Sequence, residues 1–362
     1  MTKNDYYLWG AGLYGGRLIE ILKDDFTFKA VIDNDPKKKG NQFYGLPVVS
    51  YDEIKKDLPK TKIAIAINLP TTVREFLMSE GFTENQDFFI LHEFLPRYFW
   101  SKNRMLATKN IDMAVTNVCT MKCPACQTFI PFTENPGNKK IEEIINDIDM
   151  AFSYIDIVVN VNICIGESLL NEELPIICSY IKDNYAEKYF FLAVQTNGTV
   201  MPKDDVLKQF SNSNTVFGIA GYPENESMRN SFIKKLDEHG ISWYINSASE
   251  RESSWVNFGD PRVVNETDQK KLCERYKGCW KPRSAVYDGR LYLCVIQHYY
   301  HTSVGHVSLE PGDTFDLRKP KTEESREELY KLLTAQSERG YISHCMRCNS
   351  VLNRLYKGKN KK

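Results

Sequence analysis

The chain has 362 residues, enough for two or three domains at about 100–200 residues each. Lys plus Arg and Asp plus Glu both number 47, so the formal net charge is zero, which argues against a general nucleic-acid binder or membrane-surface protein. No stretch is apolar for the ~20 residues that a membrane span needs, and the first residues lack a signal-peptide core. We therefore expect a cytoplasmic protein with neither a membrane nor a nucleic-acid partner.

The first hundred residues contain no cysteine and alternate short apolar strands with helical runs. Strands are expected at 6–9, 28–32, 63–67 and 88–91, with helices after residue 13 and at 72–79. Strands that alternate with helices predict a parallel sheet covered on both faces. Residues 1–100 should therefore form a first domain with a Rossmann-like parallel sheet.

A glycine pattern lies between the first strand and the first helical run of this domain. Gly10, Gly12 and Gly15 have the spacing G-x-G-x-x-G, and Asp33 ends the second strand, about 20 residues on, where a ribose-binding acid is expected. Such glycines let the backbone approach a phosphate at a helix N-terminus. Two interpretations remain open: a bound nucleotide or nucleotide-linked ligand, or a fold remnant whose glycines serve only the turn.

The run from Gly40 to Val48, which follows Asp33, carries a resemblance. It resembles the front domain of sugar acyltransferases of the surface-polysaccharide type, which holds a nucleotide sugar. The likeness covers most of the first hundred residues. It implies that this domain binds a nucleotide or a nucleotide sugar.

A second run of strand–helix units follows, and we assign it to residues 105–265. Strands are expected at 111–115, 155–165, 190–195, 215–220 and 242–246, with helices at 141–153, 172–184, around 206 and at 228–238. This run predicts a partial (β/α)6 barrel with its active groups at the carboxyl ends of the strands. In the strand at 155–165, Asn160, Asn162 and Cys164 alternate with apolar residues, so they should line the interior of the barrel. A packing role for Cys164 also remains open, and Cys178 repeats at helical spacing with apolar residues, which predicts a core position.

Three cysteines follow the first strand of this barrel. Cys119, Cys123 and Cys126 have the spacing C-x3-C-x2-C, without a fourth cysteine or a histidine in the loop. Thiolates are the ligands that iron–sulfur clusters and zinc select, but a structural zinc site takes four ligands. Three ligands suit a cubane cluster that keeps one iron open. The spacing resembles the signature of the radical S-adenosylmethionine superfamily.

This resemblance implies a [4Fe–4S] cluster whose open iron chelates S-adenosylmethionine. Reductive cleavage then gives a 5′-deoxyadenosyl radical, with electrons from a partner such as flavodoxin or ferredoxin. Ala125 takes a position that is usually aromatic, and Ile165 and Ser168 replace the first glycine and the proline of a Gly-Gly-Glu-Pro motif. The residues that the resemblance assigns to cofactor binding are Ala125, Gly166, Glu167, Ser168, Gln195, Asn197, Gly218 and Gly221.

The last third, residues 266–362, contains a second cysteine pattern. Cys279, Gly289 and Cys294 have the spacing C-x9-G-x4-C, and Cys345 and Cys348 follow as C-x2-C. This pattern resembles the twitch domain, a shortened SPASM domain, which implies a small cysteine-rich domain with an auxiliary [4Fe–4S] cluster. Asp288 and Gly289 predict a hairpin turn. Zinc would also accept four cysteines, and Cys273 could replace one of the four or bind substrate.

These patterns predict a radical S-adenosylmethionine enzyme of oxidoreductase type. Its expected substrate is a sugar or nucleotide-linked molecule of surface-polysaccharide or secondary metabolism, and the net reaction is expected to be an oxidation. One alternative is an enzyme that modifies peptides or proteins. In another, the front domain only senses a nucleotide or acts as a scaffold. Proton donors and acceptors are not identified, because Tyr222, Glu224, His298, Tyr299 and His301 are candidates by location alone.

Overall fold

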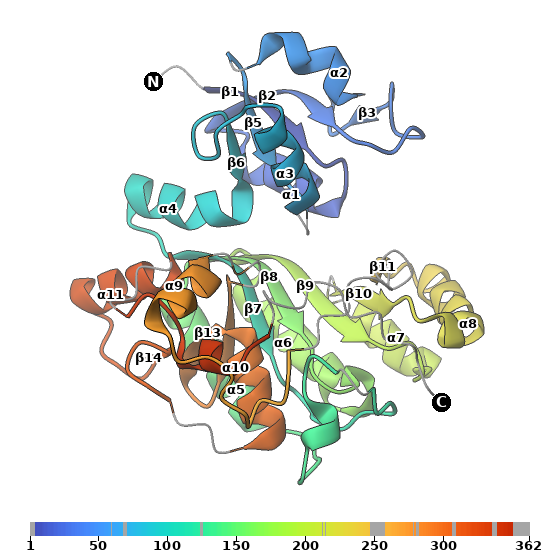
Figure 1. Ribbon diagram of the computed structural model, residues 1–362. Helices are drawn as coiled ribbons and strands as arrows, with labels where there is room; N and C mark the ends of the chain where they lie inside the picture. Colours follow the sequence, from blue (N-terminus) through green and yellow to red (C-terminus); the bar gives the residue numbers. More distant parts are fainter. Residues whose placement is uncertain are drawn as a thin grey trace. The chain divides into compact units, whose positions relative to one another are not determined.

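The computed structural model describes residues 4–349, except for residues 59, 68–70, 124–125, 212, 214, 247–257, 278, 280–281, 306–308 and 335–338. The chain divides into two compact units, Met1–Ser101 and Lys102–Lys362 (Figure 1). Each unit contains a sheet with parallel strands, which confirms the expected mixed α/β class. Among the described residues, no helix is long and apolar enough to cross a membrane.

The front unit is built on a six-stranded sheet. Its elements are β1 (Asn4–Trp9), α1 (Leu13–Leu22), β2 (Phe26–Ile32), β3 (Gln42–Phe43), β4 (Leu46–Val49), α2 (Tyr51–Ile54), η1 (Lys55–Asp57), β5 (Lys62–Ile65), α3 (Thr71–Ser79), β6 (Phe88–Ile90) and α4 (Leu91–Asn103), which runs into the second unit. The strand order is β3-β4-β2-β1-β5-β6, and only the β3–β4 pair is antiparallel. Apolar side chains of four strands and of α3 are buried together in one cluster, as expected for a parallel sheet covered by helices.

The second unit is built on an eight-stranded sheet. Its elements are β7 (Ala107–Met113), η2 (Ile130–Phe132), α5 (Ile141–Tyr154), β8 (Ile157–Ile163), η3 (Ser168–Leu170), α6 (Leu174–Tyr185), β9 (Tyr189–Thr196), α7 (Asp204–Ser211), β10 (Thr215–Ala220), η4 (Pro223–Asn225), α8 (Glu226–Glu238), β11 (Trp243–Asn246), α9 (Gln269–Lys277), β12 (Pro282–Tyr287), β13 (Arg290–Cys294), α10 (Val295–Val304), β14 (Thr314–Asp316), α11 (Glu323–Leu333) and η6 (Ser343–Met346).

Strands β7 to β11 lie side by side in chain order and are all parallel. Figure 1 shows them as the teal to yellow part of the unit, with helices between successive strands. Helix α5 buries Ile144, Ile148, Ala151 and Phe152. Helix α6 buries Leu174, Ile177, Cys178 and Ile181, whereas its Ile176 is exposed. This spacing places one apolar stripe of each helix toward the core, and it confirms the core position predicted for Cys178.

The C-terminal strands extend the same sheet. β12 pairs in parallel with β7, and β13 and β14 follow in antiparallel order. Asp288 and Gly289 join β12 to β13 with φ angles of +49° and +65°, the left-handed conformation that tight hairpin turns require. The predicted hairpin is therefore confirmed, and its strands belong to the sheet that also contains the barrel strands.

Candidate active site

The three cysteines of the loop Cys119–Cys126, called the cysteine loop below, follow β7 and are partly exposed. Burial raises the pKa of the Cys123 thiol to about 11, and the charges of Cys126 and Cys119 add to this shift. The three sulfur atoms are therefore close enough to influence one another. The Cys123 thiol is therefore protonated at neutral pH and would release its proton when iron binds it. This donor set fits a cluster with three protein ligands; Ala125 lies outside the described residues.

Polar side chains at the end of β9 hold the cysteine loop. The Asn197 amide nitrogen Nδ2 donates to Thr120 Oγ1 at 3.0 Å and lies 3.6 Å from Cys119 Sγ. Asn197 Oδ1 accepts hydrogen bonds from the backbone and hydroxyl of Thr199. Asn225, in η4, donates to the Asn197 carbonyl at 3.1 Å. Asn197, expected to bind the cofactor, thus lies directly against Cys119, a predicted cluster ligand.

Glu167 connects the ends of two barrel strands. Its backbone N–H donates to the Val118 carbonyl at 2.8 Å. Its carboxylate is fully buried and accepts hydrogen bonds from the backbone N–H groups of Asn197 at 2.8 Å and Leu169 at 3.2 Å. Burial raises the pKa of this carboxyl group, and the hydrogen bonds from the backbone oppose the shift. Glu167 therefore fixes the cysteine loop to β8 and β9, while the neighbouring Ser168 hydroxyl is buried without a partner in the described structure.

Gly218 and Gly221 lie at and after the end of β10 and have different surroundings. A Cβ atom on Gly218 would lie 2.4 Å from Gln195 Oε1 and 2.7 Å from the Tyr244 hydroxyl. The absence of a side chain therefore lets the Gln195 amide cross β10 and reach β11. Gly221 donates its backbone N–H to the Asn246 carbonyl at 2.9 Å. Both glycines thus border polar groups at the carboxyl end of the sheet.

A continuous row of polar side chains, called the polar ladder below, crosses this end of the sheet. Gln195 donates to Asn162 Oδ1 and to the Tyr244 hydroxyl, each at 2.8 Å, and accepts from Asn246 at 2.6 Å. Asn162 continues the row by donating to Asp112 Oδ1 at 2.9 Å. The ladder consists of Asn110, Asp112, Asn160, Asn162, Gln195, Tyr244 and Asn246. It places the predicted inward-facing Asn160 and Asn162 on one face with Gln195.

Sequence reasoning missed the part of the ladder that β7 contributes. The strand was expected to begin at residue 111, but it begins at Ala107, and Asn110 and Asp112 alternate within it as polar residues. Asp112 also accepts a short hydrogen bond from the Tyr299 hydroxyl, which lies 3.4 Å from Cys164 Sγ. Cys164 thus occupies a buried position next to a polar pair. The alternation of polar residues in 107–113 was the available signal.

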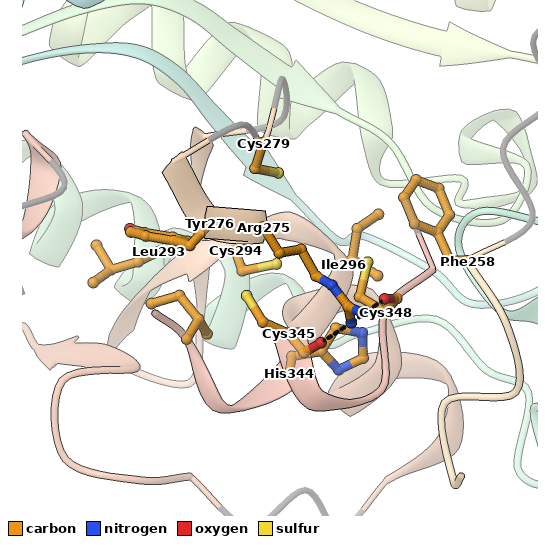
Figure 2. Close-up of a pocket in the computed structure, with 11 residues that line it drawn as sticks. Phe258, Arg275, Tyr276, Cys279, Leu293, Cys294, Ile296, His344, Cys345 and Cys348 are labelled. Atoms are coloured by element: carbon orange, nitrogen blue, oxygen red, sulfur yellow. Dashed lines mark hydrogen bonds between the residues drawn. The ribbon is translucent and has the colours of Figure 1, made fainter. Parts of the chain in front are cut away.

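The four C-terminal cysteines line one pocket, called the auxiliary pocket below: Cys279, Cys294, Cys345 and Cys348. Figure 2 shows their side chains around the hollow, with Arg275 and His344 beside them. Burial raises the pKa of Cys294 well above its usual value, and the charges of the other three cysteines add to the shift. Cys273 is absent from the lining and lies against Gly340 and the Arg339 carbonyl. The structure therefore groups the four cysteines of the predicted pattern without Cys273.

In the described part of the chain, no group of three or more His, Cys, Asp or Glu side chains surrounds a single metal-ion position. A [4Fe–4S] cluster binds cysteine thiolates as its ligands, one at each iron, so its cysteines need not converge on one point. The four thiols that share the auxiliary pocket match this donor set. They fit such a cluster by number and by chemical type.

Three rings connect the cysteine loop with the auxiliary pocket. Phe129 donates its backbone N–H to the Cys126 carbonyl at 3.2 Å. The ring centroids of Phe129 and Tyr300 lie 6.1 Å apart. The ring centroids of Tyr300 and His344 lie 5.8 Å apart, and His344 lines the auxiliary pocket. These separations are typical of packed aromatic pairs. The two cysteine sites are thus joined by one buried cluster.

In the front unit, the loop that contains Gly10, Gly12 and Gly15 packs tightly on its own backbone. A Cβ atom on Gly15 would lie 2.0 Å from the Gly10 carbonyl oxygen, whereas one on Gly12 would meet nothing within 4 Å. Asp33 accepts hydrogen bonds from the backbone N–H of Ala11 and from Lys38. Its pKa is lowered by a backbone hydrogen bond from Asp35 and by Lys38, against the effect of burial. Gly12 therefore leaves open space at the start of α1, and the Asp33 carboxylate is tied to the loop itself.

His298 gives a testable pH dependence. The ring is fully buried, and neither nitrogen has a hydrogen-bond partner in the described structure; burial, with Lys139 and His301, lowers its pKa to about 3. An unfolded histidine has a pKa near 6.5, so the unfolded chain binds more protons between these values. The unfolding free energy of the protein should fall by up to about 1.4 kcal/mol per pH unit as the pH drops from 6.5 toward 3.

Urea unfolding of the metal-free protein at pH 7, 6, 5 and 4 measures this slope. His298→Leu should flatten it, because it removes the proton acceptor and leaves no buried polar nitrogen without a partner. Equal slopes in the two proteins would contradict the assignment to His298.

Residues 113–236 match the family model described as the radical SAM superfamily. No curated protein matches the sequence. The solved structures that resemble the chain include BtrN in complex with AdoMet and 2-DOIA, at 12% identity and a TM-score of 0.43 over 69% of this chain and 96% of that one. Another is anSMEcpe with bound AdoMet and a Cp18Cys peptide, at 13% identity and a TM-score of 0.40 over 66% and 83%.

A further match is UDP-D-quinovosamine 4-dehydrogenase from Vibrio fischeri, at 20% identity and a TM-score of 0.19. It covers 22% of this chain and 72% of that one. These three structures have TM-scores below 0.5.

Proposed function

Because residues 113–236 form a radical SAM domain, we propose that the chain is a radical S-adenosylmethionine enzyme that removes a hydrogen atom from a polyhydroxylated substrate. The observation that carries this proposal is the cysteine loop, which presents three neighbouring thiols at the end of β7. Cys119, Cys123 and Cys126 would hold the cluster. When bound, a [4Fe–4S] cluster with S-adenosylmethionine supplies an electron and the deoxyadenosyl radical, chemistry that belongs to the cofactor.

The chain's own residues position these groups. Asn197 orients Cys119 through the contact with its sulfur, and Glu167 keeps Val118, Asn197 and the end of β8 together. Gly166, Ser168, Gln195, Gly218 and Gly221 lie along the same carboxyl ends of strands, where S-adenosylmethionine is expected. A radical step needs reacting atoms held in fixed geometry. The hydrogen bonds around Asn197 and Glu167 provide this rigidity.

The polar ladder supports a hydroxyl-rich substrate. Amide groups such as those of Asn162 and Gln195 both donate and accept hydrogen bonds, and sugar hydroxyl groups do the same. The ladder contains one carboxylate, Asp112, and no Lys or Arg, so it favours a neutral or amino-bearing substrate over an anionic group at this surface. We therefore place a sugar, free or linked to a nucleotide, ahead of a peptide side chain.

The auxiliary pocket supports a net oxidation. After hydrogen abstraction, a substrate radical that loses one more electron and a proton becomes a two-electron oxidised product. Cys279, Cys294, Cys345 and Cys348 would hold the [4Fe–4S] cluster that accepts this electron. A reducing partner of the flavodoxin or ferredoxin type would supply the first electron in the cytoplasm.

The substrate class is tested with protein that is purified and reconstituted without oxygen. The enzyme is reduced in the presence of S-adenosylmethionine and of one substrate pool: nucleotide sugars, free sugars or peptides. The 5′-deoxyadenosine released is then measured. We expect a sugar pool to raise its release several-fold above the level without substrate. Stimulation by peptides alone would overturn the sugar assignment and favour a peptide-modifying enzyme.

The role of the front unit is tested with Gly12→Leu. A Cβ atom at Gly12 meets no atom within 4 Å, so a side chain starts in open space at the beginning of α1 and the variant should fold. If this unit holds a nucleotide-linked substrate, deoxyadenosine release with the nucleotide-sugar pool should fall about tenfold or more, as expected for a blocked phosphate position. Release without substrate should not change. Unchanged stimulation in the variant would favour a nucleotide-sensing or scaffolding unit.

A further inference from the structure

Arg275 lies beside the auxiliary pocket and is largely buried. The residue belongs to α9, is 6% exposed and lines the pocket with the four cysteines. Its Nη1 atom donates to the Cys345 carbonyl at 2.5 Å and to the Cys348 carbonyl at 2.7 Å, as Figure 2 shows. A third contact joins it to Asn265 Oδ1 at 3.4 Å. One guanidinium group thus bridges both cysteines of the Cys-x2-Cys turn.

The positive charge of Arg275 has no carboxylate in an ion pair within the described part of the chain. Its hydrogen-bond partners there are two carbonyl oxygens and one amide oxygen. Glu266, on the neighbouring segment, forms an ion pair with Lys271 at 3.8 Å, and its pKa is lowered by backbone hydrogen bonds and by the charges of Lys271 and Arg275. A buried charge is unfavourable unless an opposite charge compensates it. Glu266 offers part of that compensation, and the thiolates of the pocket that Arg275 lines would add to it.

We propose that Arg275 is a positioning residue that fixes the Cys345–Cys348 turn and raises the reduction potential of the auxiliary cluster. The inference rests on the proposed function, because it requires a cluster in this pocket. Reduction adds one negative charge to a cluster that is already anionic. A nearby buried cation stabilises the reduced state more than the oxidised state. The cluster then accepts an electron from the substrate radical more readily.

The test is a redox titration of the reconstituted full-length protein, followed by electron paramagnetic resonance. Arg275→Gln removes the charge, whereas Arg275→Lys retains it and loses the two-carbonyl bridge. We expect Gln to lower the equilibrium constant for reduction of the auxiliary cluster about tenfold or more, a shift of 59 mV toward negative potential. The reduction potential of the auxiliary cluster in Arg275→Lys should stay near the wild-type value. The cluster of the cysteine loop serves as the internal reference and should not shift in either variant.

Asn265→Asp gives an independent measurement if Arg275→Gln fails to retain the cluster. It places a carboxylate next to Arg275 and leaves the bonds of Arg275 to the two carbonyls in place, but it removes the hydrogen bonds of Asn265 Nδ2 to the Arg347 carbonyl and to Asn349 Oδ1. This variant should also shift the auxiliary potential toward negative values. If Arg275→Gln holds the auxiliary cluster and its reduction potential equals that of the wild-type protein, the inference is overturned. If Arg275→Gln does not hold the cluster, a wild-type potential in Asn265→Asp overturns it.

Iron analysis separates this failure from a failure of the proposed function. Combined Cys279→Ser and Cys345→Ser substitutions should halve the iron content of the wild-type protein. If the iron content does not change, the pocket holds no cluster, and both the auxiliary part of the proposed function and the role of Arg275 are wrong. If the iron content halves but the reduction potential of the auxiliary cluster does not change in the charge variants at Arg275 and Asn265, only the inference on Arg275 is wrong.

Discussion

Gly166→Ala should remove most of the iron held by the cysteine loop and abolish deoxyadenosine formation. Gly166 has a φ angle of +59°, and a Cβ atom there would lie 2.3 Å from the Val118 carbonyl oxygen and 3.2 Å from the Val118 backbone nitrogen. The left-handed conformation alone is unfavourable for alanine by about 1–2 kcal/mol. The clash is with backbone atoms, so the Val118 segment must move, and Cys119 follows it directly in the chain.

Gly137→Ala is the matched control for this substitution. Gly137 contacts the same loop, since it donates its N–H to Asn117 Oδ1 at 2.7 Å. A Cβ atom there meets nothing within 4 Å, and its φ angle is not positive. This variant should keep its iron and its activity. Full iron content in Gly166→Ala, measured beside this control, would show that the close approach at Val118 does not position the cysteine loop.

Asp147→Ala should lower the free energy of unfolding by about 3–5 kcal/mol, the range for breaking a buried ion pair. Asp147 is a buried residue of α5 whose carboxylate accepts the backbone N–H groups of Asp288 at 3.0 Å and Gly289 at 2.7 Å. It also forms a short ion pair with Lys139, which is itself mostly buried. The substitution leaves two backbone donors without their acceptor and a mostly buried ammonium group whose remaining contact is the Tyr287 ring, 4.4 Å away. Denaturant unfolding of the metal-free protein measures the change.

Lys139→Met combined with Asp147→Ala tests the reason for this loss. If the ammonium group left without its carboxylate causes much of the effect, the double variant should be more stable than the sum of the single changes predicts. The hairpin of β12 and β13 carries Cys294 at its end, so we also expect Asp147→Ala to bind less iron in the auxiliary pocket. If Asp147→Ala lowers the free energy of unfolding by less than about 1 kcal/mol, as expected for a surface ion pair, the role of Asp147 is contradicted.

The cysteine patterns, from which we infer cofactor binding, depend most on local sequence. Three thiols at short spacing can reach one cluster wherever the chain goes next, and the Asp288–Gly289 dipeptide determines its hairpin locally. Both features depend on a few neighbouring residues. The grouping of Cys279 and Cys294 with Cys345 and Cys348 was predicted from the resemblance, and the shared pocket agrees with it.

Long-range pairings could not be predicted in this way. The contact of β12 with β7 joins residues 284 and 111, and no local pattern specifies it. Asn110 was missed because polar residues at the start of β7 resemble a loop when the strand's partners are unknown, and Asp112, although within the expected strand, was not recognised as a partner of Asn162. Glu167 was expected to bind the cofactor, but nothing in the sequence indicated that its carboxylate accepts the Asn197 N–H.

The measurement that tests the central claim most directly is 5′-deoxyadenosine formation by reduced, oxygen-free enzyme with S-adenosylmethionine. Wild-type protein should form it, and Cys123→Ala should not, because two thiols cannot hold the cluster that binds the cofactor. Iron and sulfide are determined on the same samples. Absence of deoxyadenosine from wild-type protein with an intact cluster in the cysteine loop, with and without the substrate pools, would contradict radical S-adenosylmethionine chemistry in this chain.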